Sequence, residues 1–80
     1  MFEKYTMEKI RIDNDKWIRN GSQIRLEQKP DLYTVYVYEE IGMIELLNRV
    51  TNKRYTAGQR SSSGWEWGGD LCHVKEVVEF

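Results

Sequence analysis

The stretch "LYTVYVY", residues 32–38, is the clearest structural signal in this chain. Its side chains are mainly β-branched or aromatic, and such side chains suit the pleated, half-buried surface of a sheet. Strand alternation puts Tyr33, Val35 and Val37 on one face. The other face carries Leu32, Thr34, Tyr36 and Tyr38. Because neither face is plainly polar, we predict a strand in the middle of a sheet.

The segment before it, "QIRLEQ" (residues 23–28), predicts a second strand. Ile24 and Leu26 alternate with polar residues, the pattern of a sheet with one face on the core and one in water. Pro30 and Asp31 then favour a turn between the two strands, because proline presets φ and aspartate can bond its own backbone.

Upstream, Asn20 and Gly21 tolerate the positive φ angles of a two-residue type I′ turn. A hairpin there would set Trp17 opposite Ile24. It would also set Lys16 opposite Arg25, a like-charge pair that weakens the interpretation. A looser turn leading into the strand is the alternative.

The stretch "EEIGMIELLNRVTNKRY", residues 39–55, fits two structures. Met43, Leu46, Leu47 and Val50 have helical spacing, with acids before them and bases after them, as a helix dipole favours. Ile44 and Leu46 also fit strand alternation with Glu45 outward. We favour a strand, a tight turn around residues 51–53 and a return strand carrying Tyr55 over a helix across residues 40–53.

The ends and the serine-rich segment complete the pattern. "YTMEKIRI" (residues 5–12) predicts a strand with Ile10 and Ile12 inward. "LCHVKEVVEF" (residues 71–80) predicts a closing strand, or a short helical turn over residues 71–74 followed by one. Residues 59–64 contain no apolar side chain to bury, so we predict a mobile loop there.

Short strands separated by turn signals predict an all-β fold: one domain over residues 1–80, a small SH3-like or OB-like barrel of about five strands with room for one short helix. The run "IRNGSQIRL…LYTVYVYEEIGMIELLN" resembles the layout of SH3-like small barrels, including small phage and prophage accessory proteins. The resemblance covers residues 17–55. It implies a binding module rather than a catalyst, and no functional residue carries over from it.

Composition supports a small folded domain. Of the 80 residues, 40% are hydrophobic and 31% are charged, which is enough apolar material for a compact fold. The one cysteine cannot form an internal disulfide, and there is neither a signal-like start nor an apolar run near the roughly 20 residues of a membrane span. We expect a soluble, cytoplasmic protein without a membrane partner, monomeric or a small homo-oligomer.

Catalysis is not expected from these residues. His73 is the only histidine, and on a strand it would point away from its neighbour Cys72, the only cysteine. One cysteine and one histidine cannot form a structural zinc site. Glu39 and Glu40 fit a solvated turn better than a catalytic pair. We therefore predict no catalytic residue, no metal and no cofactor, with Cys72 buried and His73 at the surface.

Binding residues are predicted from charge and aromatic content. The net charge is −1, yet residues 48–64 carry four cations and no acid. Trp65 and Trp67 are two apart, so on a strand both project from one face. They either close the bottom of the core or form a partly exposed platform. The candidate binding residues are Arg49, Lys53, Arg54, Tyr55, Arg60, Trp65, Trp67, Tyr36 and Tyr38.

Two functions compete for this surface. A protein-binding module, such as an inhibitor protein of phage or mobile-element type, would use tryptophan and arginine as anchors. A small barrel that binds single-stranded DNA or RNA would stack bases on the aromatic rings and pair phosphates with the basic loop. Acidic residues on both sides of the basic segment should repel a long polyanion, so we favour a protein partner.

Overall fold

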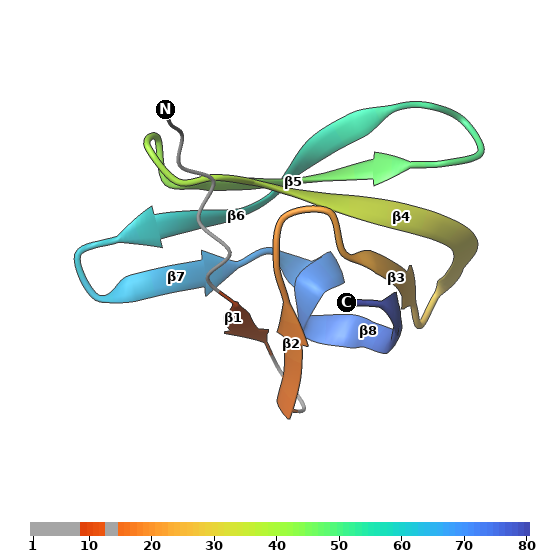
Figure 1. Cartoon of the computed structure of the whole chain (residues 1–80), viewed down its shortest axis with the longest axis horizontal. Helices are drawn as coiled ribbons and strands as arrows, with labels where there is room; N and C mark the ends of the chain where they lie inside the picture. The colour runs from red at the N-terminus through yellow and green to blue at the C-terminus, as the bar shows by residue number, and fades with distance from the viewer. Residues whose placement is uncertain (1–8, 13–14) are drawn as a thin grey trace.

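The computed structural model describes residues 9–12 and 15–80, and strands account for most of them (Figure 1). In chain order the elements are β1 (Ile10–Ile12), β2 (Lys16–Ile18), β3 (Gln23–Leu26), β4 (Lys29–Tyr38), β5 (Met43–Asn48), β6 (Arg54–Ser61), β7 (Gly64–Trp67), the 3₁₀ helix η2 (Gly69–His73) and β8 (Val74–Glu79). The all-β prediction is confirmed. Residues 5–8 of the first predicted strand lie outside the described residues.

The strands form one large sheet and one small ribbon. Six antiparallel strands follow the order β7-β6-β5-β4-β3-β8, and β1 pairs with β2. The large sheet curls like part of a barrel, and η2 connects its two edge strands (Figure 1). This sheet has six strands where about five were expected, and its β8, the closing strand predicted at the C-terminus, pairs with β3.

The core lies on the inner face of the curled sheet. Val35 of β4 pairs with Leu46 of β5, and Ile24 of β3 pairs with Tyr33 of β4. The twelve buried residues of this core are Ile10, Ile12, Ile18, Ile24, Leu26, Tyr33, Val35, Ile44, Leu46, Ala57, Leu71 and Val74. The inward positions expected from strand alternation are therefore confirmed, and the ribbon and η2 cover the sheet.

Residues 43–61 form the favoured hairpin rather than the alternative helix. Asn48, at the end of β5, shapes its turn: the side-chain oxygen accepts hydrogen bonds from the N–H groups of Val50 at 2.8 Å and Thr51 at 3.0 Å. Asn52 adopts a positive φ of 64°, which asparagine tolerates better than most residues. The helical spacing is coincidental, because Val50 is exposed in this turn.

The interpretation of Asn20 and Gly21 as a type I′ hairpin turn is wrong. Gly21 has a positive φ of 94° while Asn20 does not, and the N–H of Ser22 donates to the carbonyl of Arg19. This is the looser turn, with a positive φ at its third position only, as in type II turns. Trp17 consequently pairs with Arg11 of β1 instead of Ile24.

The prediction of a turn at Pro30 and Asp31 is also wrong. The turn lies at residues 27–28, and β4 already begins at Lys29, which pairs with Leu26. The Pro30 carbonyl accepts a hydrogen bond from Arg25 across the strands. A register shift beside Arg25 allows this early start of β4.

Residues 59–64 form a tight hairpin instead of a loop. β6 extends to Ser61, a two-residue turn follows, and β7 begins at Gly64. The hydroxyl of Ser61 donates to the carbonyl of Gly64, whose φ is 117°. At the C-terminus, the alternative of a helical turn followed by a strand is confirmed by η2 and β8.

Candidate interaction surface

The nine predicted binding residues do not form one surface. Strand register divides them, because cross-strand partners project from the same face of a sheet. Arg60, Trp65, Trp67 and Tyr55 lie on the inner face, Tyr36, Tyr38 and Arg54 lie on the outer face, and Arg49 and Lys53 lie between β5 and β6. The predicted basic loop is therefore wrong, since Arg54 and Arg60 are strand residues.

Trp65 and Trp67 stack on the inner face of β7. Their ring centroids are 6.1 Å apart and their planes differ by 6°. Both rings are half-buried and pack against the core. Gly58 makes room for this arrangement: a Cβ on it would lie 3.1 Å from Cε3 of Trp67. Each indole thus closes the core and also presents surface, so both alternatives apply in part.

Arg60 extends this surface. Its guanidinium carbon lies 5.2 Å from the centroid of a Trp65 ring, within range of a cation–π contact. Nη1 donates to Glu39 Oε1 at 3.2 Å, and Nη2 donates to the Glu39 carbonyl. The backbone N–H of Arg60 donates to the carbonyl of Gly42. We call Arg60, Trp65 and Trp67 the tryptophan face.

A second cluster lies on the outer face. The Arg54 guanidinium lies 5.1 Å from the ring centroid of Tyr36, donates to the Tyr38 hydroxyl at 3.2 Å and pairs with Glu45 at 3.6 Å. The Tyr38 hydroxyl donates to the same Glu45 oxygen. Partial burial and this hydrogen bond raise the pKa of Tyr38 above its ordinary value. The cluster satisfies its own polar groups, and we call it the tyrosine face.

Tyr55 has a structural role at the junction of β6, β4 and η2. Its hydroxyl donates to Asp70, which also accepts a hydrogen bond from Lys29 at 3.0 Å. Its ring meets Tyr33 edge-on, with centroids 6.3 Å apart. Burial and the bond to Asp70 raise the pKa of Tyr55. Burial also tends to raise the pKa of Asp70. The hydrogen bonds from Tyr55 and Lys29 outweigh burial, and the pKa of Asp70 therefore lies below its ordinary value.

The remaining two predicted cations are exposed. Arg49 is tied to the sheet by its backbone, since its N–H donates to the carbonyl of Leu32 at 2.9 Å. Within the part of the chain that the structure describes, neither Arg49 nor Lys53 forms an ion pair. Of the four predicted cations, two therefore have their charge balanced by carboxylates of the same chain.

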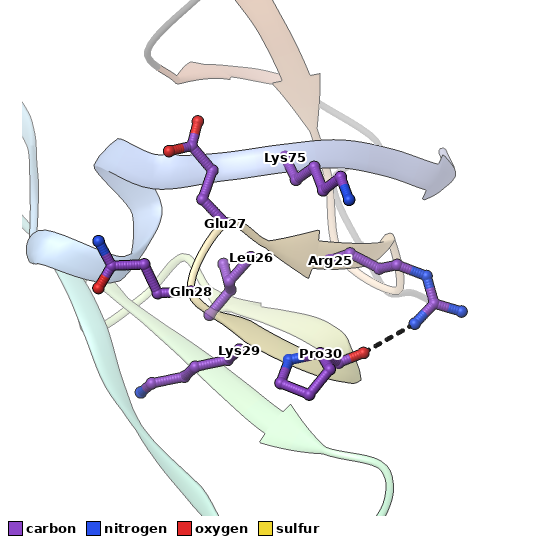
Figure 2. Close-up of a pocket in the computed structure, with 7 residues that line it drawn as sticks. All are labelled: Arg25, Leu26, Glu27, Gln28, Lys29, Pro30 and Lys75. Atoms are coloured by element: carbon purple, nitrogen blue, oxygen red, sulfur yellow. Dashed lines mark hydrogen bonds between the residues drawn. The ribbon is translucent and has the colours of Figure 1, made fainter.

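Sequence reasoning missed a hollow between the β3–β4 turn and β8. This hollow is open to solvent, has a volume of about 360 Å³ and is lined by Arg25, Leu26, Glu27, Gln28, Lys29, Pro30 and Lys75 (Figure 2). Arg25 donates to the Pro30 carbonyl there and pairs with Glu76 at 3.6 Å. The β3–β8 pairing that brings Lys75 here joins segments about fifty residues apart, and no motif in the sequence marks it.

The structure places Cys72 and His73 in η2, so the strand alternation that was used to separate their side chains does not apply. His73 is exposed, as expected, whereas Cys72 is half-buried rather than buried. Among residues 9–12 and 15–80, no group of three or more His, Cys, Asp or Glu side chains could hold a metal ion. No helix in the same residues is long and apolar enough to cross a membrane.

Comparison of the chain with protein-family models, with curated proteins and with solved structures found no match.

Proposed function

We propose that this protein is a non-catalytic module that binds another protein through the tryptophan face. The observation that carries the proposal is the stacked pair of half-buried tryptophans beside Arg60 on an edge hairpin. Tryptophan and arginine are the residue types most enriched among binding hot spots.

The side chains of the tryptophan face contact one another and their neighbours in the chain. Stacking and the close approach to Gly58 hold the two indoles, and Glu39 holds Arg60. A partner would therefore lose little side-chain entropy on contact, and such preorganisation increases affinity.

Charge balance favours a protein partner over single-stranded nucleic acid. Phosphate binding requires cations that can release counterions from the nucleic-acid backbone. Arg54 is paired with Glu45, and Arg60 is paired with Glu39. Moreover, these two arginines lie on opposite faces of the sheet, so they do not line one track for a strand of phosphates. The resemblance to small phage and prophage barrels supports a partner-blocking inhibitor as the specific form of this function.

The proposal is tested with substitutions that spare the core. Trp65→Leu keeps an apolar contact with the core but removes the stacked indole, and Arg60→Ala removes the cation. Trp17→Ala and Arg25→Ala are matched controls, because both side chains are exposed on other elements. Circular dichroism and thermal unfolding first establish that each variant folds.

The measurement is capture of host-cell proteins by each immobilised variant, followed by binding to a mixed-sequence single-stranded oligonucleotide at two salt concentrations. We expect a captured protein that is lost with Trp65→Leu and Arg60→Ala and retained with both controls. Oligonucleotide binding that weakens steeply with salt and with Arg60→Ala would instead establish the nucleic-acid alternative.

A further inference from the structure

Among the residues that the structure describes, β7 is an edge strand of the large sheet and pairs with β6 only. The pair Ser61 and Gly64 closes a two-residue turn, so these residues share backbone hydrogen bonds. Bonded and non-bonded pairs alternate along an antiparallel ladder, so the backbone groups of Trp65 and Trp67 point away from β6. The 2.7 Å hydrogen bond from the Gly68 N–H to the Ala57 carbonyl agrees with this alternation, because Ala57 and Gly68 follow the non-bonded pair Gly58 and Trp67.

Four backbone groups therefore point away from β6 at this edge: the N–H and carbonyl groups of Trp65 and Trp67. In the described part of the chain, β7 pairs with β6 alone, and no other backbone hydrogen bond reaches these groups. The opposite edge differs. There β8 lies beside β2, and the carbonyl of Phe80 accepts hydrogen bonds from Ser22 and Arg19.

The side chains of β7 define what could pair with it. Trp65 and Trp67 project from one face, and Glu66 projects from the other, where its cross-strand neighbour is the neutral Gln59. Glu66 is exposed, and among the described residues no cation pairs with it. An added strand would fit if it placed apolar side chains beside the indoles and Lys or Arg beside Glu66.

A second copy of this chain fits less well. Two β7 strands that used all four groups in an antiparallel pair would align Trp65 of one copy with Trp67 of the other. The two copies of Glu66 would then stand directly opposite each other in a non-hydrogen-bonded pair, where side chains are closest. Like charges in that position are destabilising.

We propose that an extended segment of the partner protein, alternating apolar and basic residues, adds to β7 as a seventh strand of the large sheet. This inference rests on the proposed function and specifies which residue types the partner presents to β7. Main-chain hydrogen bonds would supply affinity, and alternate side chains would supply specificity, as in other cases of strand addition.

The test uses the intact protein and short synthetic peptides with blocked ends. The probe is SVKVKVS, and its matched opposite is SVEVEVS. Two further probes carry one N-methyl group, on the central valine or on a lysine. A valine opposite a tryptophan directs its N–H toward β7, whereas the lysine N–H points to water. Binding is measured by NMR titration, together with hydrogen exchange of the Trp65 and Trp67 amides.

We expect SVKVKVS to bind and to slow exchange at both amides. Methylation of the central valine should weaken binding about tenfold, because it removes a hydrogen bond and adds bulk at the interface. Methylation of the lysine backbone N–H should change the affinity less than about twofold, since that N–H has no partner on β7. Glu66→Lys should weaken SVKVKVS about fivefold and should strengthen SVEVEVS.

Three results would overturn strand addition: no binding at millimolar peptide, equal effects of the two methyl groups, or unchanged exchange at Trp65 and Trp67. Dimers in sedimentation equilibrium with these amides already protected would assign the edge to a second copy instead. If one of these results appears while Trp65→Leu still abolishes capture of the partner, the proposed function stands without strand addition.

Discussion

The indole rings of Trp65 and Trp67 are parallel to within 6°, with centroids 6.1 Å apart. Strand geometry alone puts both rings on one face, but Gly58 across the hairpin determines how closely Trp67 approaches the sheet. The tryptophan face therefore depends on a residue that contributes no side chain to it.

Replacement of Gly58 tests this dependence. Gly58→Ala places a methyl group 3.1 Å from Trp67 and 3.3 Å from the Glu66 carbonyl, so the ring must move. We expect a loss of about 1–2 kcal/mol in the free energy of unfolding, as for other overpacked sites. Urea unfolding measures this loss, and the indole N–H shift of Trp67 reports the displacement. Gly69→Ala is the control, because its Cβ would meet nothing within 4 Å; equal effects of the two variants would contradict the packing argument.

Asn48 is the second expected point of sensitivity. Its amide nitrogen donates to Asp31 and to the buried Tyr33 hydroxyl, while its oxygen holds the β5–β6 turn. We expect Asn48→Ala to cost about 2–3 kcal/mol of unfolding free energy, because several partners lose their hydrogen bonds together. Asn20→Ala, which removes one exposed bond to the Val37 N–H, should cost about 1 kcal/mol or less. A similar small loss for both variants would show that the turn forms without Asn48.

Asp70 should make stability depend on acid pH. Its pKa is lowered in the folded chain, so its stabilising effect is complete above the unfolded value, near 3.9, and is lost as pH falls through the folded value. We expect Asp70→Asn to be less stable than wild type by about 1 kcal/mol at pH 6, since this carboxylate is partly exposed. The difference should shrink steadily below pH 4. Unfolding in urea at several pH values measures it, and a difference that stays constant to pH 2 would exclude the linkage.

Removal of the carboxylates that pair with Arg54 and Arg60 should increase the affinity of the protein for nucleic acid. The double variant Glu39→Gln, Glu45→Gln removes the carboxylates that pair with Arg60 and Arg54. We expect stronger binding to a single-stranded oligonucleotide and a logarithmic salt slope steeper by roughly 0.7, the value for one new phosphate contact, because the two arginines lie on opposite faces and one strand meets only one of them.

Its control is Glu27→Gln, Glu40→Gln, which changes net charge equally at two exposed acids outside these pairs. If both double variants gain the same affinity, the effect comes from net charge, and the local pairing does not suppress phosphate binding.

Strand alternation predicted most of the sheet. Val35 and Leu46 face the core, as their alternation with outward residues predicted, because successive side chains of a strand point to opposite faces of the sheet. Turn positions were less predictable. Pro30 lies inside β4 because the register shift beside Arg25 moves the turn to residues 27–28, and no local signal shows that shift.

The candidate site was predicted as a set of residue types but not as an arrangement. Arg60 meets Glu39, 21 residues away, only because the β4–β5 and β5–β6 registers bring their strand ends together. The sequence therefore showed four cations within residues 48–64, whereas the structure pairs two of them, Arg54 and Arg60, with carboxylates of other strands or turns. The placement of Trp65 and Trp67 on one face was the part that local spacing could predict, because both residues belong to one strand.

The response of the three indole N–H signals to the captured partner shows whether the tryptophan face binds it. In a ¹H–¹⁵N spectrum of the labelled protein, we expect the Trp65 and Trp67 signals to shift or broaden as partner is added, while that of the exposed Trp17 stays in place. The Arg60 Nε–H signal should move with them, and the Arg54 Nε–H signal should not. A spectrum in which Trp17 or Arg54 responds while Trp65 and Trp67 remain unchanged would show that the tryptophan face is not the binding surface.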